Sequence, residues 1–134
     1  MWIYKNNMIT SIEDMPEDSI GFIYIVYHKP TNKKYIGKKI LEVSKKLPPL
    51  KGKKRVRRVK KESDWLSYFG SNDTIREMIK EGKQDEFKRE ILFFAKTKRQ
   101  LSYLETRELF KRDVLESDEY FNSNILGKFY KGNI

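Results

Sequence analysis

The feature that most constrains the fold is an apolar run, Phe22 to Tyr27, which is followed closely by a turn and a second short run. The first run is β-branched and aromatic without polar alternation, which predicts a strand buried on both faces. Pro30-Thr31-Asn32 predicts a turn, because proline presets φ and asparagine tolerates the left-handed conformation. Lys34 to Gly37 returns as a second strand. Residues 21–37 are therefore predicted to form an antiparallel hairpin.

The remaining secondary structure is predicted from the second half of the chain. Thr74 to Glu77 has the spacing of a capping box, and the helix that it starts is expected to end at Gly82. Phe87 to Ala95 has an apolar centre and predicts a third strand. Thr97 to Gln100 predicts the cap of a second helix, which continues to about Leu115.

The order of these elements predicts an α+β fold. Two strands, an insert, a helix, a strand and a second helix are typical of a small, three-stranded, mainly antiparallel sheet flanked by helices. Tyr120 to Asn124 is expected to close the fold as a packed loop or a short final helix. The length is typical of one domain, so residues 1–134 are assigned to a single domain with residues 1–19 as an N-terminal extension.

All of the excess positive charge lies in a basic insert, residues 38–63. Between Lys38 and Lys61 there are 12 lysines and arginines and one acid, Glu42, whereas the rest of the chain has 17 basic and 18 acidic residues. Such segregation indicates a polyanionic partner, and nucleic acid is favoured over a membrane surface because no amphipathic helix accompanies the charge. A solvated, disordered loop is the alternative. The insert lacks apolar periodicity, which predicts a long loop or extended arm with a short strand at Arg55 to Val59.

The residue types that are present restrict the chemistry of any site. The chain has no cysteine and one histidine, His28, which excludes disulfides, cysteine-ligated zinc and His-rich metal sites. A metal must therefore be held by carboxylates and water, which favours Mg²⁺, Mn²⁺ or Ca²⁺. His28 is expected at the surface of the hairpin turn. No apolar run could span a bilayer and no signal peptide begins the chain, so a soluble, cytoplasmic protein without a membrane partner is predicted.

Two tyrosine triplets stand out on the predicted hairpin. Tyr24 ends a Phe-Ile-Tyr triplet on the first strand, and Tyr35 begins a Tyr-Ile-Gly triplet on the second. A glutamate on the second helix, Glu105, and an asparagine after an aromatic pair, Asn122, follow in that order. This set resembles the GIY-YIG nuclease family, although the first triplet lacks the initial glycine. Trp65 to Ser71, which follows the basic insert, resembles a phage-encoded, Seg-type branch of that family.

The resemblance implies an endonuclease that hydrolyses phosphodiester bonds in double-stranded DNA with Mg²⁺ or Mn²⁺. It implies that Glu105 is the sole protein ligand of the metal, with water completing the coordination. On a helix, Glu105 would lie between Leu101 and Leu109, where an unpaired carboxylate is costly. A structural salt bridge to Arg112 is the alternative interpretation, and Glu108 is the alternative ligand.

The resemblance also implies that one tyrosine of the pair, Tyr24 or Tyr35, deprotonates the attacking water. A phenol with a pKa near ~10 is a poor base at neutral pH unless nearby cations lower that pKa. Lys38 directly follows Gly37 and is expected to do this. Packing in the core is the alternative for each tyrosine alone. Asn122 is expected to brace the site by hydrogen bonding.

The catalytic arginine implied by the resemblance is not fixed by the sequence. In compact family members it lies about ten residues after the second tyrosine, where this chain has Lys45, which lacks the planar bidentate fork of arginine. The insert offers Arg55, Arg57 and Arg58 instead. Arg58 is the first choice and Arg57 the second, because they lie nearest the ordered region that begins at Trp65.

Further polar residues are predicted to contact DNA: Lys39, Lys53, Lys54, Arg55, Lys60, Lys61 and Ser71. Ser71 leads into a helix N-terminus, which could hold a phosphate, although helix capping explains it equally well. Specificity is expected to come from the insert or from a homodimer, or to be low, and the Seg-type likeness implies homing or host-DNA degradation in a bacterial cell. Two alternatives stay open. One is a catalytically inert nucleic-acid-binding module on the same fold, and the other is an RNA-binding accessory protein.

Overall fold

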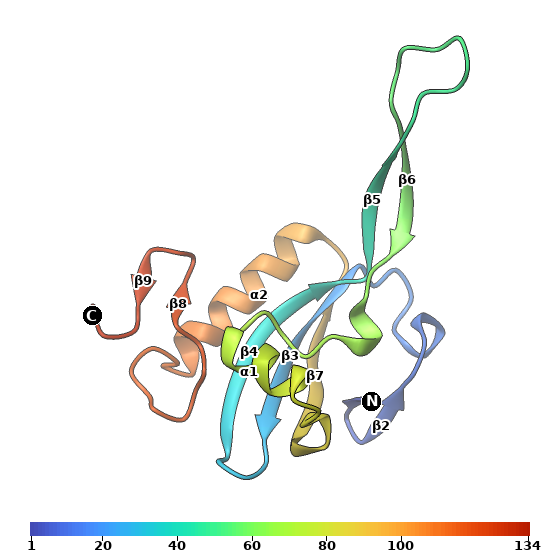
Figure 1. Ribbon diagram of the computed structural model, residues 1–134. Coiled ribbons are helices and arrows are strands. Elements are labelled where there is room, and N and C mark those ends of the chain that lie inside the picture. The colour runs from blue at the N-terminus through green and yellow to red at the C-terminus, as the bar shows by residue number, and fades with distance from the viewer.

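A five-stranded mixed sheet forms the centre of the computed structural model, which describes residues 1–134 (Figure 1). The strand order is β2-β1-β7-β3-β4, and every neighbouring pair is antiparallel except β1 and β7. The strands are β1 (Trp2–Tyr4), β2 (Asn7–Ile9), β3 (Gly21–His28), β4 (Lys33–Ile40) and β7 (Phe87–Ala95). The predicted α+β class and the β3–β4 hairpin are confirmed, and β7 has the predicted bounds.

Two α-helices flank the sheet, α1 (Asp73–Lys80) and α2 (Lys98–Lys111). The N-cap of α1 is Asn72, whose side chain accepts from the Ile75 backbone N–H at 3.2 Å, so the predicted capping box that starts at Thr74 is wrong. The N-cap of α2 is Thr97, as predicted. Three short 3₁₀ turns lie at Ile12–Asp14, Trp65–Ser67 and Gln84–Glu86. Helix α2 ends before the predicted Leu115, because the chain turns at Asp113, which has a positive φ of 51°.

Strand β3 is buried on both faces, as its uninterrupted apolar sequence predicts. Phe22, Tyr24 and Val26 enter one core cluster, which α1 covers, whereas Ile23 and Ile25 enter a second cluster beneath α2. The alternation of side chains along β3 therefore divides the molecule into two apolar layers with the sheet between them. The tyrosine of the first triplet lies in the α1 layer.

The N-terminal segment is part of the sheet, so the prediction of three strands is wrong in detail. Strands β1 and β2 form a small hairpin, and β1 pairs in parallel with β7. The driving contact is Trp2, whose ring is fully buried and packs edge-on against Phe22 with centroids 4.9 Å apart. Its indole N–H donates to the Trp65 carbonyl at 2.8 Å. The first strand therefore ties the loop after the insert to the core.

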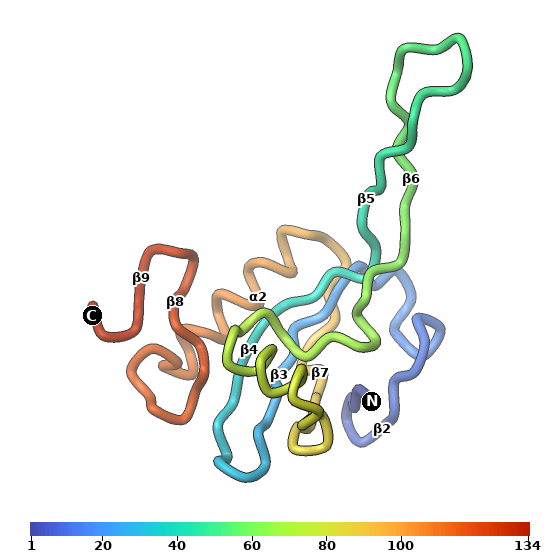
Figure 2. The backbone as a smooth tube through the Cα atoms, viewed as in Figure 1, coloured from blue at the N-terminus to red at the C-terminus, as the bar shows by residue number.

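The basic insert forms a two-stranded antiparallel ribbon that projects from the body as an arm (Figure 1). Its strands are β5 (Glu42–Leu47) and β6 (Arg57–Glu62). Figure 2 traces the arm from the end of β4 to its tip and back toward α1. The prediction of an extended arm is confirmed, but the strand predicted at Arg55 to Val59 runs instead from Arg57 to Glu62 and pairs with β5, and Lys38 to Ile40 belong to β4. Almost every residue of the ribbon is exposed.

The C-terminal segment lies along the outer edge of β4. Lys34 donates to the Glu119 carbonyl at 2.8 Å, and its own carbonyl accepts from the Phe121 N–H at 2.7 Å. Tyr120 forms an isolated parallel bridge with Lys34. A last small hairpin follows, β8 (Asn124–Ile125) with β9 (Phe129–Tyr130). No helix of the protein is both long and apolar enough to cross a membrane.

Candidate active site

The two triplet tyrosines lie side by side on neighbouring strands. In the β3–β4 ladder Tyr24 is opposite Gly37 and Val26 is opposite Tyr35, so the two tyrosines are diagonal neighbours on one face. Their ring centroids are 6.3 Å apart. Tyr24 is 1% exposed, whereas Tyr35 is only partly buried. The hairpin therefore brings the pair together, with Tyr24 beneath and Tyr35 nearer the surface.

Two glycines leave room for the tyrosine pair. A Cβ on Gly37 would lie 2.4 Å from the Tyr24 hydroxyl, a distance that real side chains do not reach. Gly70 has a φ of +109° and passes close over Tyr35, since a Cβ there would lie 3.2 Å from the Tyr35 ring and 3.4 Å from the Tyr24 hydroxyl. Only glycine combines this backbone conformation with so close an approach. The two glycines therefore let the backbone enclose the phenols.

The loop that carries Gly70 covers the pair from above. The Tyr68 ring packs edge-on against Tyr24 with centroids 6.0 Å apart. The hydroxyl groups of Tyr35 and Ser71 are 2.9 Å apart and hydrogen bonded. Ser71, expected from the sequence to contact DNA, is thus placed beside the more accessible of the two phenols.

A buried arginine that the sequence analysis missed holds this loop. Arg89 on β7 is 5% exposed and donates to the carbonyls of Leu66 and Tyr68 at 3.0 and 2.8 Å. Its guanidinium lies 4.6 Å from the Trp2 ring and 4.1 Å from the Phe69 ring. Burial lowers the pKa of Arg89 to about 10, so it stays charged at neutral pH. The only signal in the sequence was the position of Arg89 within a strand, and a strand position does not predict that a side chain anchors a loop.

An open cleft of about 530 Å³ lies beside Tyr35. Tyr35, Ser71, Glu105 and Asn122 line it, from β4, the loop before α1, α2 and the C-terminal segment respectively. Tyr24 does not line the cleft. Four predicted site residues that are far apart in the sequence therefore meet around one solvent-accessible space.

Glu105 is the carboxylate of this cleft. It is partly buried on α2, and the structure contains no ion pair to it. Burial raises the pKa of Glu105, while the charge and the backbone N–H of Lys38 act in the opposite direction. A desolvated carboxylate without an ion pair is stabilised by a cation. The alternative of a salt bridge to Arg112 is wrong.

Glu108, the alternative metal ligand, occupies a different environment. It is 2% exposed and lies between two arginines, with Arg112 Nε 3.3 Å from Oε1 and Arg107 Nε 3.4 Å from Oε2. The contact to Oε2 is an ion pair without hydrogen-bond geometry. A carboxylate already neutralised by two guanidinium groups has little need of a metal, and Glu108 does not line the cleft.

The expectation that Lys38 lowers a tyrosine pKa does not hold in this structure. Burial raises the pKa of Tyr24 well above its ordinary value and also raises that of Tyr35. The hydrogen bond to Ser71 and, more weakly, the charge of Arg76 oppose the rise at Tyr35. The Lys38 ammonium donates instead to the Ser102 hydroxyl at 3.0 Å, one turn before Glu105 on α2.

The arginines of the insert lie on the arm. Arg58 is opposite Lys46 in the ribbon, and Arg57 donates through Nε to the Pro48 carbonyl at 3.2 Å. Neither lines the cleft. Arg76 on α1 is the arginine whose charge acts on Tyr35, and it was read in the sequence only as part of a capping motif.

The predicted DNA-binding residues fall into two groups. Lys53, Lys54 and Arg55 are exposed at the tip of the arm, and Lys60 and Lys61 are exposed on β6. Lys39 is different, because its ammonium is ion-paired with Asp64 and lies 3.9 Å from the Tyr68 ring centroid. Lys39 therefore stabilises the loop over the tyrosines.

Two further polar residues are buried near the site. Asn122 accepts from the Ile36 N–H at 3.0 Å and donates to the Ile36 carbonyl at 2.9 Å, which fixes the edge of β4 between the triplet residues. His28 is 4% exposed and is hydrogen bonded to Thr31 and Glu86, so the expectation of a surface histidine is wrong.

No group of three or more His, Asp or Glu side chains could hold a metal. A single carboxylate still suits Mg²⁺, because this ion keeps several water ligands and takes one or two carboxylates together with substrate phosphates. Glu105 is the residue that fits this role, since it is desolvated, free of ion pairs and open to the cleft.

The fold and the cleft together define the class. The fold brings a tyrosine pair on a hairpin, a helical glutamate and an asparagine that braces the second strand into one region, the set of residues on which the resemblance to the GIY-YIG family rests. A family model described as "Putative endonuclease segE, GIY-YIG domain" matches residues 2–125. The chain therefore belongs to the Seg-type GIY-YIG endonuclease family. A comparison with curated proteins and one with solved structures each returned no match.

Proposed function

We propose that the protein is a divalent-metal-dependent endonuclease that hydrolyses phosphodiester bonds in double-stranded DNA. The observation that carries the proposal is the cleft itself, in which the desolvated carboxyl of Glu105 and the phenol of Tyr35 line one open space. Family membership supports the nuclease activity. The basic arm supports a nucleic-acid substrate.

Glu105 would hold Mg²⁺ or Mn²⁺ at the scissile phosphate. When bound, such an ion neutralises phosphate charge and lowers the pKa of water. Tyr35 accepts the proton of the attacking water as its phenolate. That form is scarce at neutral pH because burial raises the Tyr35 pKa, so added positive charge at the cleft favours the reaction.

Tyr24 contributes to the site by positioning Tyr35. It is 1% exposed, its pKa is raised well above the ordinary value, and it does not line the cleft. Its hydroxyl lies under Gly37 and its ring packs against Tyr68 and Tyr35. Tyr24 therefore supports the Tyr35 ring and fixes its position relative to the loop that carries Gly70.

Arg76 is the best-placed arginine for the transition state. It lies on α1 and does not itself line the cleft, but its charge opposes the rise that burial causes in the pKa of Tyr35. The helix is anchored at its start by Asn72, which donates to the Phe121 carbonyl at 3.0 Å. Arg57 and Arg58, first chosen from the sequence, lie on the exposed arm and suit phosphate attraction better.

The remaining expectations extend this proposal. The arm residues Lys53, Lys54, Arg55, Lys60 and Lys61 attract the DNA backbone, and a homodimer would allow both strands to be cut. We also propose a phage-encoded homing or DNA-degrading role in a bacterial cytoplasm, which the Seg-type resemblance of Trp65 to Ser71 supports.

Single-turnover cleavage separates the two arginine roles. We expect Arg76→Ala to bind DNA normally but to lose cleavage by roughly 10²-fold or more, as for the loss of one charge-stabilising donor. Arg58→Ala should bind more weakly and recover its rate at saturating enzyme. The opposite result would assign the catalytic arginine to the arm. Tight metal-independent DNA binding with no cleavage by the unmodified protein would favour the inert binding module.

A further inference from the structure

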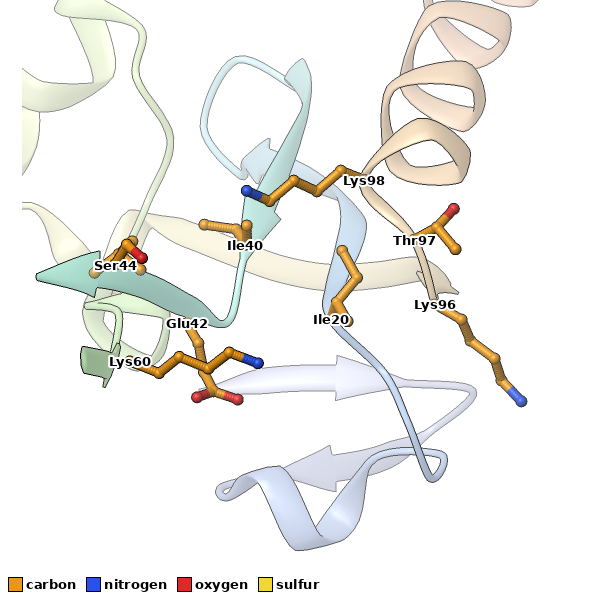
Figure 3. A pocket seen from close by; sticks show the side chains of 9 residues that line it. Ile20, Ile40, Glu42, Ser44, Lys60, Lys96, Thr97 and Lys98 are labelled. Carbon is orange, nitrogen blue, oxygen red and sulfur yellow. The ribbon is translucent and has the colours of Figure 1, made fainter. Parts of the chain in front are cut away.

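A second cleft, of about 460 Å³, lies between the base of the arm and the start of α2 (Figure 3). Its floor is apolar, with Ile20 and Ile40. Lys60 of β6 lines one side and Lys98 of α2 lines the other. The cleft thus joins the basic arm to the helix that carries the candidate metal ligand.

The two lysines are free to bind an anion. The lysines that pair with a carboxylate are elsewhere, at Lys34, Lys39, Lys83 and Lys88. Lys96 also lines the cleft, but its ammonium points away from the other two in Figure 3. One acid, Glu42, lies at the cleft, so Lys60 and Lys98 leave a net of one positive charge there, to which Lys96 adds from outside.

The attraction comes from the lysines and not from the end of the helix. The Thr97 hydroxyl accepts from the Gln100 N–H at 3.0 Å, and the Gln100 side chain accepts from the Lys96 N–H at 2.9 Å. These caps use backbone and side-chain groups that would otherwise bind an anion.

One face of α2 connects this cleft to the candidate active site. Lys98, Ser102 and Glu105 are spaced i, i+4 and i+7, so they lie on the same side of the helix. Lys38 reaches the middle of this face through its bond to Ser102. Lys98 and Glu105 are separated along the axis by about 10 Å, at 1.5 Å per residue. Along the axis of a duplex that lies parallel to α2, that distance is the rise of roughly three base pairs.

We propose that the cleft between the arm and α2 is a phosphate-binding subsite that holds a DNA strand about three nucleotides from the bond that is cut. The inference rests on the proposed nuclease function and adds a second point of contact to it. Lys60 and Lys98 hold the backbone from two sides, while Lys38 lies between them and Glu105. The strand is thereby aligned along α2 before it reaches the cleft of Tyr35.

The test compares two double variants by DNA binding in EDTA at several salt concentrations. Lys60→Gln/Lys98→Gln removes the proposed contacts, and Lys111→Gln/Lys128→Gln removes the same charge at the far end of α2 and in the C-terminal hairpin. We expect the first variant to reduce the slope of log K against log salt by roughly 1.8, at about 0.9 per phosphate contact. Between 50 and 200 mM salt the unmodified protein should then lose roughly tenfold more affinity than this variant.

Two outcomes would overturn the proposal. One is an equal change of slope in both double variants, and the other is no change in the first, provided that circular dichroism shows native folding. The distance between the subsite and the cleaved bond is tested separately, by cleavage of end-labelled duplexes. The unmodified protein should cleave slowly where fewer than about three base pairs flank the cut on one side, and the Lys60/Lys98 variant should lose this dependence. If the cleavage rates of both proteins depend on the length of flanking DNA in the same way, the subsite is refuted.

These outcomes are separable from failure of the nuclease proposal. The binding measurement uses no metal and no cleavage, so its slope reports the cleft alone. A protein that nicks plasmid with an unchanged slope would refute only the subsite. A protein with the expected slope change but no cleavage would refute only the nuclease.

Discussion

Replacing Arg89 with lysine should destabilise the protein more than replacing it with methionine, although lysine is the chemically more similar residue. Arg89 is buried, has no carboxylate partner and is held by two backbone carbonyls and two aromatic rings. Its pKa is lowered from 12.5 to about 10, which corresponds to a burial cost of about 3 kcal/mol. Two hydrogen bonds from a charged donor return about 1.5–3 kcal/mol each. The ring contacts add about 1 kcal/mol or more.

Arg89→Lys keeps most of the burial cost but can reach only one carbonyl, because an ammonium lacks the guanidinium fork. Arg89→Met removes the burial cost and leaves both carbonyls without a donor, at about 1–3 kcal/mol each. We expect losses in the free energy of unfolding of about 3 kcal/mol for lysine and about 2 kcal/mol for methionine. Urea denaturation followed by circular dichroism measures both values.

The reasoning is refuted if lysine is tolerated within about 0.5 kcal/mol, or if lysine is clearly less damaging than methionine. Either result would mean that the charge, and not the pair of carbonyl bonds, is what position 89 supplies. The loop that Arg89 anchors carries Gly70 and Ser71. Both variants should therefore also cleave DNA more slowly at temperatures where they remain folded.

Three further predictions concern the cleft. Because burial raises the pKa of Tyr35, the cleavage rate should rise by up to tenfold per pH unit above neutral, whereas Tyr35→Phe should be slow and nearly independent of pH; an equal pH dependence in both proteins would exclude Tyr35 as the base. The raised pKa of Glu105 means that the metal-free protein loses stability as pH rises from the ordinary glutamate value through the raised one, so Glu105→Gln should melt higher than the unmodified protein at pH 7 without metal. Mg²⁺ at ten times its dissociation constant should raise the melting temperature of the unmodified protein by roughly 3–5 °C, from about 1.4 kcal/mol of binding, and should leave Glu105→Gln unchanged.

The parts of the fold that the sequence predicted are those set by local patterns. The β3–β4 hairpin follows from an apolar run and a turn, and the start of α2 follows from the cap at Thr97. The positions of Tyr35 and Glu105 on these elements brought both into one cleft. Tyr35 and Glu105 line the same cleft because β4 and α2 pack against each other.

The features that escaped prediction depend on contacts between distant segments. Strands β1 and β2 have three residues each, too few for a periodic signal, and they exist because Trp2 packs against β3 and bonds to the Trp65 carbonyl. His28 is buried through Glu86, which is 58 residues away. The ribbon of the arm has no buried face, so it produces no apolar alternation. The place of Arg76 near Tyr35 depends on how α1 packs over the sheet.

The central claim is that Glu105 makes the cleft a metal-dependent nuclease site, and plasmid nicking tests it most directly. Supercoiled plasmid is incubated with the unmodified protein and with Glu105→Gln, each in Mg²⁺ and in EDTA, after both proteins are shown to bind DNA equally in EDTA. We predict nicking by the unmodified protein in Mg²⁺ only, and a loss of roughly 10²-fold or more in Glu105→Gln. Nicking by Glu105→Gln at the unmodified rate, or nicking that persists in EDTA, would contradict the account.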